Sequence, residues 1–405
     1  MSSPESHGFS PSRLTRIDRF FKEQYVGCGK LPGTQLLIAR QGEIVHESVQ
    51  GLADRERGIM LTSDTIFRIY SMTKPITSVA FMMLVEEGQV ALDDPVHRYI
   101  PAWSDLGVFV SGTLGAFQAR RCNAPMRIVD LLRHTSGLTY DIQTRTNVDA
   151  AYRKLNIGVI GSDVSLEAMI DRLAAIPLEF SPGEAWNYSI STDVLGYLIG
   201  AISGIPFEEF LQTRILGPLG MTDTAFYVAE DKHARFAACY GLNGAGQLVL
   251  QDDPRTSRFL SPPIFVSGGG GLVGTAADYM KFCNMLLAGG VANGHRFLSP
   301  KTIALMTLNH LPGGCHLTDM PRSVFSEAIY AGVGFGLGFA VTCDLAKTMI
   351  AGSVGEYFWG GMASTAFWID PLEDIAVVFM TQFMPSNTYP IRRQLRTLVY
   401  AALEG

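Results

Sequence analysis

The chain is 405 residues long, 47% of them hydrophobic and 17% charged, with a formal net charge of −6. The charged fraction lies below the roughly 25% of an average globular protein, and no long segment combines strong charge with few aromatic residues, which excludes disordered and fibrous classes. A mildly acidic chain lacks the positive field that nucleic acids and anionic membranes require, so we expect neither as a partner.

The sequence favours a cytoplasmic location. Residues 1–16 are polar and contain no apolar signal-peptide core. The longest apolar stretch, Val194–Ile205, is too short to span a bilayer and is interrupted by glycines. Six cysteines occur without a C-x-x-C pair. A chain with this much apolar content does not need disulfides, so we expect free thiols.

The first part of the chain carries strand and helix patterns. A loose tail is expected over residues 1–12. The elements predicted after it are an amphipathic helix on Leu14, Ile17 and Phe21, strands at Thr34–Arg40 and Glu43–Val49 joined by a Gln41-Gly42 turn, and a helix from Ile76 that ends at Gly88.

The middle of the chain is mainly helical and the end returns to strands. Helices are predicted at Ile128–Arg133, Leu166–Ala175, Ser191–Ser203, Phe207–Leu216 and Ala276–Ala288. Strands are predicted at Gly334–Thr342, Thr348–Gly352, Ala363–Ile369 and Ile375–Gln382, before a final helix over Thr388–Leu403.

This order predicts a discontinuous domain. Residues 1–95 and 322–405 would form an α/β domain with one antiparallel sheet flanked by helices, and residues 96–321 would form a mainly helical domain. A small-molecule site is expected in the cleft between the two domains.

The tetrapeptide Ser71-Met72-Thr73-Lys74 stands at the start of the second predicted helix. Residues three apart share a helix face, so the Lys74 ammonium can reach the Ser71 hydroxyl. A serine is a poor nucleophile until a neighbour takes its proton, and a lysine with a depressed pKa can do so. The positive end of the helix dipole also favours the alkoxide. On the tetrapeptide alone, a capping serine beside a solvated lysine stays an alternative.

Further stretches strengthen the catalytic interpretation. They are Phe67–Lys74 continuing through Ala91–Val96, Leu131–Leu138, Phe180–Glu184 followed by Tyr188-Ser189-Ile190 and Gly196–Ile199, Gly268–Gly271 with Ala276–Tyr279, and Phe358–Gly361. In this order they resemble the serine β-lactamase and penicillin-binding-protein superfamily over about residues 16–403. The resemblance is greatest to the class C branch and its esterase relatives. It implies the β-lactamase/transpeptidase-like α/β fold, with the active site between sheet and helices.

Two departures from the β-lactamase pattern change the expected substrate. The chain has Tyr188-Ser189-Ile190 where β-lactamases carry Tyr-x-Asn, and Trp359-Gly360-Gly361 where they carry Lys-Thr-Gly. Without the amide, cation and hydroxyl of those motifs, the preference for an anionic lactam should be lost. Trp-Gly-Gly is similar to the family VIII carboxylesterases and related acyltransferases, which implies neutral or apolar esters. We assign substrate binding to Ile190, Trp359, Gly360 and Gly361.

The resemblance also implies the role of each residue. Ser71 attacks the ester carbonyl and forms an acyl-enzyme. Tyr188, with its pKa lowered by Lys74, is the general base, and Lys74 relays protons. The sequence leaves open which of the two begins the cycle deprotonated. The backbone N–H groups of Ser71 and Met362 form the oxyanion hole, and Trp359 forms an apolar wall of the pocket.

Other candidates are weaker. His134 lies in a structural segment of the family and is interpreted as a hydrogen-bonded structural histidine. His310 and His316 lack metal-site spacing, so no metal is expected. Asp93-Asp94, next to a proline, is typical of a turn. The Gly268–Gly271 run is interpreted as a loop of close backbone approach, and this run and residues 147–164 are expected to shape the pocket.

The sequence thus predicts a serine carboxylesterase that hydrolyses neutral, short-chain esters through an acyl-enzyme, without metal or organic cofactor. Its expected partner is a small-molecule ester. The alternatives are an acyltransferase that passes the acyl group to an alcohol, a weak β-lactamase or D-peptidase, and a non-catalytic acyl-binding module. The last would be expected to lack Ser71, Lys74 or Tyr188, and all three are present.

Overall fold

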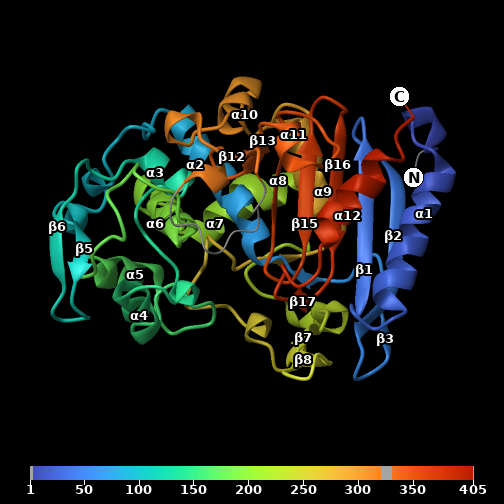
Figure 1. Cartoon of the computed structure of the whole chain (residues 1–405), viewed down its shortest axis with the longest axis horizontal. Helices are drawn as coiled ribbons and strands as arrows, with labels where there is room; N and C mark the ends of the chain where they lie inside the picture. The colour runs from blue at the N-terminus through green and yellow to red at the C-terminus, as the bar shows by residue number, and fades with distance from the viewer. Residues whose placement is uncertain (1–2, 321–330, 405) are drawn as a thin grey trace.

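A computed structural model of the chain describes residues 3–320 and 331–404. Its main feature is an eight-stranded sheet in the order β12-β13-β14-β15-β16-β1-β2-β3 (Figure 1). The strands, in chain order, are β1 (Gly33–Arg40), β2 (Glu43–Asp54), β3 (Ile59–Met60), β12 (Val333–Phe335), β13 (Ala340–Thr342), β14 (Tyr357–Gly360), β15 (Ala366–Asp370) and β16 (Ile375–Met380). Every neighbouring pair is antiparallel.

The two ends of the chain meet in this sheet. Strand β1 pairs with β16, with Leu37 opposite Val378. The β1–β2 hairpin turns at Gln41 and Gly42, whose φ angles of 55° and 78° are both positive, as a tight two-residue hairpin turn requires. The predicted sheet of N- and C-terminal segments is therefore confirmed.

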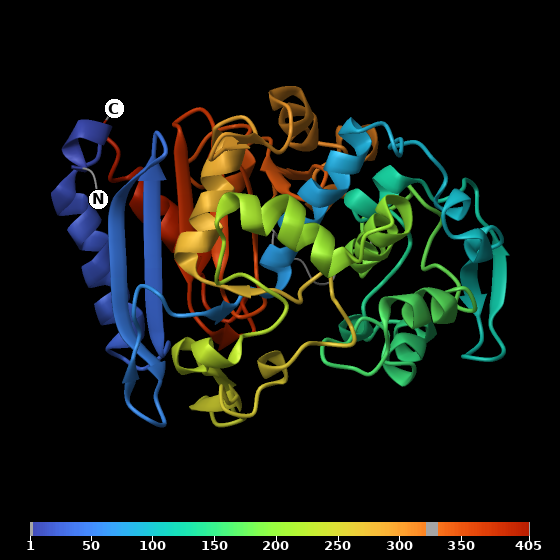
Figure 2. The same cartoon turned by 180° about the vertical axis from the view of Figure 1, so that it is seen from behind.

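Helices cover both faces of the sheet. Helix α1 (Pro11–Phe21) packs beside α12 (Ile391–Tyr400) on the face seen in Figure 1. Helix α9 (Ala276–Leu287) lies on the other face, against β16 and β1 (Figure 2). The prediction of a loose tail is wrong for residues 9–12, because Phe9 is fully buried and forms a β-bridge with Leu403, and Pro11 begins α1.

The remaining elements form the helical side of the molecule and its edges. Helix α2 (Thr73–Glu86) packs along α6 (Ser191–Ser203), which also contacts α3, α5 and α7. The other helices are α3 (Ile128–Leu132), α4 (Asn147–Lys154), α5 (Leu166–Leu173), α7 (Phe207–Leu211), α8 (Gly217–Leu219), α10 (Pro300–Met306) and α11 (Leu345–Thr348). The small sheets pair β5 (Gly107–Ser111) with β6 (Gln118–Arg121), β4 (Phe67–Arg68) with β9 (Val273–Gly274), β10 (Val291–Ala292) with β11 (His295–Arg296), and β7 (Cys239–Leu242) with β8 (Leu248–Asp252) and β17 (Phe383–Met384).

Two predictions about the C-terminal half need correction or stay open. The strand predicted at Thr348–Gly352 is wrong: α11 ends at Thr348, Met349 takes a left-handed φ of 55°, and the strand β14 begins only at Tyr357. The domain boundary predicted at residues 321/322 lies outside the described residues. Helix α9, assigned by sequence to the helical domain, packs on the sheet, so the two domains share elements.

The sequence also predicted free cysteines and no apolar stretch long enough to span a bilayer. All six cysteines are free, as expected. Over residues 3–320 and 331–404, no single helix has the length and hydropathy of a membrane span. Within these described ranges, one pair of helical segments, Ser191–Ser203 and Phe207–Leu219, has that length and hydropathy when taken together, and the two are bent by 85° relative to each other.

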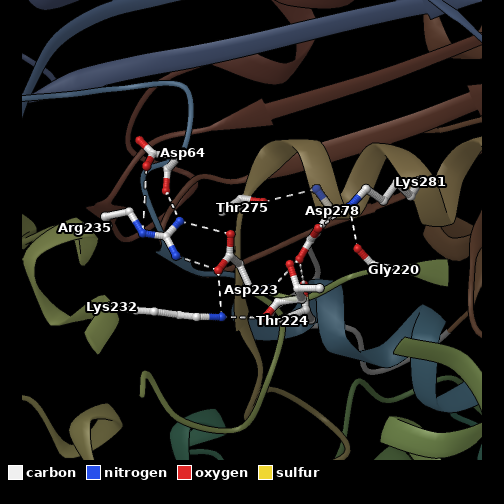
Figure 3. Close-up of polar contacts among 10 residues, drawn as sticks. Asp64, Gly220, Asp223, Thr224, Lys232, Arg235, Thr275, Asp278 and Lys281 are labelled. Atoms are coloured by element: carbon white, nitrogen blue, oxygen red, sulfur yellow. Dashed lines mark hydrogen bonds and ion pairs between the residues drawn. The ribbon is translucent and has the colours of Figure 1, made fainter. Parts of the chain in front are cut away.

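A network of ion pairs and hydrogen bonds surrounds Asp223 (Figure 3). The Asp223 carboxylate accepts hydrogen bonds from Arg235 at 2.6 and 3.0 Å and pairs with Lys232 at 2.9 Å. The Asp278 carboxylate, in the first turn of α9, accepts from the backbone N–H of Asp223 at 2.8 Å. Ala225, two residues after Asp223, bridges Val273 of β9, and β9 pairs with the strand that leads to Ser71.

Candidate active site

Ser71 lies in a single helical turn, Tyr70–Met72, that leads into α2. The residue before it, Tyr70, has a φ of 42°, which is rare for a residue with a side chain and marks a strained position. The β4–β9 pair holds the preceding residues Phe67 and Arg68 in place. The chain therefore reaches Ser71 through a fixed, sharply bent backbone.

Lys74 lies one turn further along and is almost completely buried. Its ammonium donates hydrogen bonds to Ser71 Oγ at 3.3 Å, to the Tyr140 hydroxyl at 2.9 Å and to the Gly269 carbonyl at 2.7 Å. Its Nζ atom also lies 4.5 Å from the centre of the Tyr188 ring. The charge of this buried lysine is thus met by polar oxygens and by an aromatic face.

Tyr188 lies just before α6 and is 3% exposed. Its hydroxyl forms a 2.6 Å hydrogen bond with Ser71 Oγ. The indole nitrogen of Trp359 donates a longer hydrogen bond to the same hydroxyl, at 3.4 Å. The structure therefore brings together the three residues predicted to be catalytic, Ser71, Lys74 and Tyr188.

A cavity of about 630 Å³ opens beside Ser71 and Tyr188. Its lining includes the apolar residues Ile142, Val159, Ile160, Phe259, Met362 and Met384 and the acidic residues Asp141, Asp193, Asp252 and Asp253. Gly158 and Ser267, Gly269 and Gly270 also line it. Of the two segments expected to shape the pocket, residues 158–160 and the pair Gly269-Gly270 line this cavity.

The Trp359-Gly360-Gly361 motif ends β14 and packs against the turn that carries Ser71. A Cβ atom on Gly361 would lie 2.4 Å from the Ile69 carbonyl oxygen, so only glycine allows this approach. Met362, the next residue, is partly exposed and lines the cavity beside Ser71. This placement brings Met362 next to the nucleophile, while its oxyanion-hole role stays a prediction.

The residues assigned to substrate binding are not among those that line the cavity. Trp359 is 2% exposed and packs its ring against those of Tyr188 and Phe335, both at 5.4 Å. Ile190 is fully buried at the N-terminus of α6 and packs on Gly158. Gly360 and Gly361 are buried too and do not line the cavity. The sequence predicted that Trp359 forms a wall of the pocket. The structure shows it in contact with Tyr188 instead.

Two site residues were missed by sequence reasoning. Tyr140 contacts Lys74, and burial, with Asp193 nearby, raises its pKa well above the ordinary value. Asp193 is 1% exposed, and burial raises its pKa while the Lys74 charge opposes that rise. Tyr140 stands two residues after the Leu131–Leu138 segment, and Asp193 lies in the first turn of α6. Their nearness to recognised motifs was the available signal.

His134 has the structural role that was predicted. It is buried, its Nδ1 atom lies 3.2 Å from Ser189 Oγ, and its ring packs against those of Trp186, Tyr188 and Phe335. Burial and the charge of Lys74 hold its pKa well below the ordinary value, so the imidazole is neutral. A neutral imidazole among three aromatic rings serves packing.

The remaining polar candidates have simpler explanations. Asp94 accepts hydrogen bonds from Ala91 N–H at 2.9 Å and from Tyr99 at 2.7 Å, so it stabilises a turn as predicted. Among the residues that the structure describes, no three His, Cys, Asp or Glu side chains converge as a metal site would.

The fold and the site together define a class of protein. An antiparallel sheet joined to a helical region, with serine and lysine at the start of a buried helix and a tyrosine hydroxyl on the serine, is the arrangement of β-lactamase-like serine hydrolases. The chain belongs to the Beta-lactamase family, whose model matches residues 18–402.

Known proteins extend this assignment. The chain is 35% identical to Protein Rv1367c of Mycobacterium tuberculosis over 363 residues, which cover 88% of this chain and 87% of that protein. It is 31% identical to Esterase EstB of Burkholderia gladioli over 410 residues, 96% of each chain. The solved structure of EstCE1, described as a hydrolase with promiscuous acyltransferase activity, superposes with a TM-score of 0.79 at 27% identity, over 96% of this chain and 98% of that one. The chain is therefore a serine hydrolase of this fold, and the resemblance to the superfamily is confirmed.

Proposed function

We propose that the protein is a serine carboxylesterase of the family VIII type, acting in the cytoplasm on neutral, short-chain carboxylic esters. The observation that carries the proposal is the position of Ser71 Oγ, 2.6 Å from the Tyr188 hydroxyl and 3.3 Å from Lys74 Nζ. The similarity to Esterase EstB over 96% of each chain supports the reaction class.

In the first half of the proposed reaction, Ser71 Oγ attacks the ester carbonyl. Tyr188, at hydrogen-bond distance, takes the hydroxyl proton while the new C–O bond forms. The tetrahedral intermediate then collapses, the bond to the alcohol breaks, and Tyr188 returns the proton to the leaving oxygen. The buried Lys74 ammonium offsets the negative charge that Tyr188 carries before it takes the Ser71 proton and again after it has returned that proton.

In the second half, water attacks the acyl-enzyme. Tyr188 takes a proton from water while the new C–O bond forms. The bond between the acyl carbon and Ser71 Oγ then breaks, Tyr188 returns the proton to Ser71 Oγ, and the carboxylic acid leaves. The backbone N–H groups of Ser71 and Met362 would bind the oxyanion in both halves. The close contact between Gly361 and the Ile69 carbonyl supports this assignment, because it fixes the strand end beside the nucleophile.

The charge of the cavity supports neutral substrates. Asp252 and Asp253 belong to the cavity lining, while the arginines that pair with them, Arg68 at 2.8 Å and Arg57 at 2.6 Å, do not. The guanidinium of Arg258, which also lines the cavity, donates to the Ile160 carbonyl. The lining thus contains four aspartates and Arg258, a balance of charge that disfavours an anionic lactam, because a carboxylate ligand needs a cationic partner.

The mixture of apolar and polar residues in the lining supports a short acyl chain. Apolar side chains such as Val159, Ile160 and Met362 form one part of it, and the segment from Gln251 to Arg258 supplies a polar part. A long acyl chain would extend past the apolar residues to this polar part, where burial of its methylene groups gains less free energy.

An acyltransferase is the second candidate. It is favoured by the similarity to EstCE1, which is described as a hydrolase with promiscuous acyltransferase activity. In this case an alcohol replaces water in the second half of the reaction, and the same three side chains serve. Adding a series of alcohols to the esterase assay and measuring the transesterified product separates the two activities.

The test compares a short-chain aryl ester with a chromogenic cephalosporin. We expect fast ester turnover, little lactam turnover, and loss of at least about a thousandfold in kcat for Ser71→Ala and Tyr188→Phe. Ser104→Ala, an exposed serine outside the cavity, is the matched control and should retain activity. Ester turnover that survives Ser71→Ala, or lactam turnover as fast as ester turnover, would contradict the proposal.

A further inference from the structure

Asp193 is a buried carboxylate that the proposed reaction leaves without a role. It lies in the first turn of α6, is 1% exposed and belongs to the lining of the active-site cavity. Its Oδ1 atom accepts hydrogen bonds from Ser267 Oγ at 2.6 Å and from the Gly269 N–H at 3.0 Å. One oxygen of Asp193 therefore holds the glycine-rich loop at two points.

The same loop binds the catalytic lysine. The Gly269 carbonyl accepts a hydrogen bond from Lys74 Nζ at 2.7 Å. Gly269 therefore connects Lys74, through its carbonyl, to Asp193, through its N–H. The loop is also attached to α2 by a 2.8 Å hydrogen bond from Thr77 Oγ1 to the Gly268 carbonyl. A Cβ atom on Gly269 would lie 2.6 Å from Asp193 Oδ2 and 3.0 Å from the Tyr140 hydroxyl, so the loop is pressed between these side chains.

The charges around Lys74 single out Asp193. The titratable groups that face this region are Tyr188, Tyr140, His134, Asp141 and Asp193. His134 is held neutral, and burial raises the pKa of the Tyr140 hydroxyl, so neither carries charge near neutral pH. Asp141 is partly exposed at the cavity, where water screens its charge.

We propose that Asp193 is a positioning residue for the Lys74–Tyr188 pair: it fixes the Gly269 carbonyl that binds Lys74, and its buried negative charge sets the pH range in which Ser71 is activated. The inference rests on the proposed function, because it assigns a cause to the pH range of that reaction. Two hydrogen bonds to Oδ1 stabilise the ionised carboxylate. The Lys74 charge acts in the same direction, against the effect of burial.

The expected sign follows from electrostatics. A negative charge favours the ammonium form of a nearby amine and disfavours the phenolate form of a nearby tyrosine. Removing that charge therefore moves both kinds of proton loss to lower pH. The acid and alkaline limbs of the kcat/KM profile should shift together, whichever of Lys74 and Tyr188 begins the cycle deprotonated.

The test separates the charge from the hydrogen bonds. Asp193→Asn retains an oxygen that can accept from Ser267 and Gly269 but removes the charge. Ser267→Ala removes one hydrogen bond and keeps the charge. We expect both limbs of Asp193→Asn to move by roughly one pH unit to the acid side. Ser267→Ala should keep the limbs of the wild type and lower kcat by only a few-fold.

The measurement uses the full chain and two readouts. One is kcat/KM for the aryl ester between about pH 5 and about pH 10, a range that reaches the ordinary pKa values of tyrosine and lysine. The other is the rate at which a fluorophosphonate probe labels Ser71 over the same range, which needs no ester turnover. Thermal unfolding shows whether each variant is folded. Asp193→Ala, which removes both charge and acceptor, should shift the limbs and also lower kcat.

The outcomes distinguish the two proposals. Unshifted limbs in a folded Asp193→Asn variant would overturn the inference, as would an equal shift in Ser267→Ala, which would point to loop position alone. If the wild type labels at Ser71 but turns over no ester, the esterase proposal fails while the labelling rates still test Asp193. If the wild type does not label at all, Ser71 is not activated and both proposals fail.

Discussion

The indole N–H of Trp359 donates a 3.4 Å hydrogen bond to the hydroxyl of Tyr188, and the two rings pack at 5.4 Å. Trp359 stands where β-lactamases carry the lysine of their third motif. In this chain the position therefore contacts the general base of the proposed reaction, whereas the sequence suggested contact with the substrate. Because Tyr188 also bonds to Ser71, a change at Trp359 should act on the reaction rate more than on substrate binding.

Trp359→Phe tests this relationship. Phenylalanine keeps much of the ring packing and removes the N–H donor, so we expect kcat to fall about 3- to 10-fold with little change in KM for the aryl ester. Phe335→Leu, which alters the other ring packed on Trp359, controls for loosened packing. A large rise in KM at constant kcat would instead mean that Trp359 binds substrate as a pocket wall.

The second prediction concerns Gly269. An alanine Cβ there would lie 2.6 Å from the Asp193 carboxylate and 3.0 Å from the Tyr140 hydroxyl, so the loop that binds Lys74 must move. We expect Gly269→Ala to lower kcat/KM at least about tenfold, because displacement of the Lys74 partner by 1 Å suffices for such losses. Gly244→Ala is the matched control, since its Cβ meets nothing within 4 Å. Wild-type activity in a folded Gly269→Ala variant would show that the loop position is unimportant.

The sequence predicted most of the fold because its strong local signals agree with the tertiary structure. The Gln41-Gly42 hairpin and the helix that begins near Ser71 are such cases. The strand predicted at Thr348–Gly352 failed because a short apolar run does not distinguish a strand from the end of a helix. The buried Phe9 shows the opposite error, since a polar tail can be fixed by one aromatic side chain that packs far away in sequence.

In the candidate site, too, the residues with a local sequence signal were predicted and the others were missed. Ser71, Lys74 and Tyr188 were predicted because each belongs to a motif with recognisable spacing. Tyr140 and Asp193 have no such motif, and their importance lies in contacts with Lys74 and Gly269 that only the folded chain creates. Motifs therefore identify the groups that react, whereas the residues that orient these groups depend on contacts between distant segments.

The third prediction uses the ion-pair network of Figure 3. Arg235 and Lys232 hold the pKa of Asp223 at about 2, below its ordinary value of 3.8. A depressed pKa means that this carboxylate stabilises the fold above about pH 4 and that the contribution is lost as the pH falls towards 2.

We therefore expect Asp223→Asn to lower the free energy of unfolding by about 1 kcal/mol at pH 7, a value reduced for solvent screening of a partly exposed pair. The difference from the wild type should shrink between pH 4 and pH 2, the interval between the two pKa values. Urea unfolding at several pH values measures it, with the exposed Asp105→Asn as the control. A difference that stays constant down to acid pH would contradict the assignment to Asp223 ionisation.

The last prediction concerns α12 and the sheet, away from the active-site cavity. Arg396 forms an ion pair with Glu356, and their side chains are 8% and 2% exposed. Glu356 also accepts hydrogen bonds from Thr342 at 2.9 Å and from Tyr400 at 2.6 Å. Removing Arg396 leaves a buried carboxylate without its cation, which costs about 3–5 kcal/mol in comparable pairs.

Arg396→Met should therefore lower the free energy of unfolding by about that amount, while the kcat/KM of the folded protein stays unchanged because neither residue lines the cavity. Adding Glu356→Gln should recover part of the loss, since a neutral amide needs no cation. Arg393→Met, an exposed neighbour on α12, is the control in chemical unfolding experiments. If the single and double variants are equally unstable, the cost comes from the lost packing of Arg396 against Phe358 and Trp368, whose ring centres lie 4.0 and 5.3 Å from its guanidinium, and the charge argument is wrong.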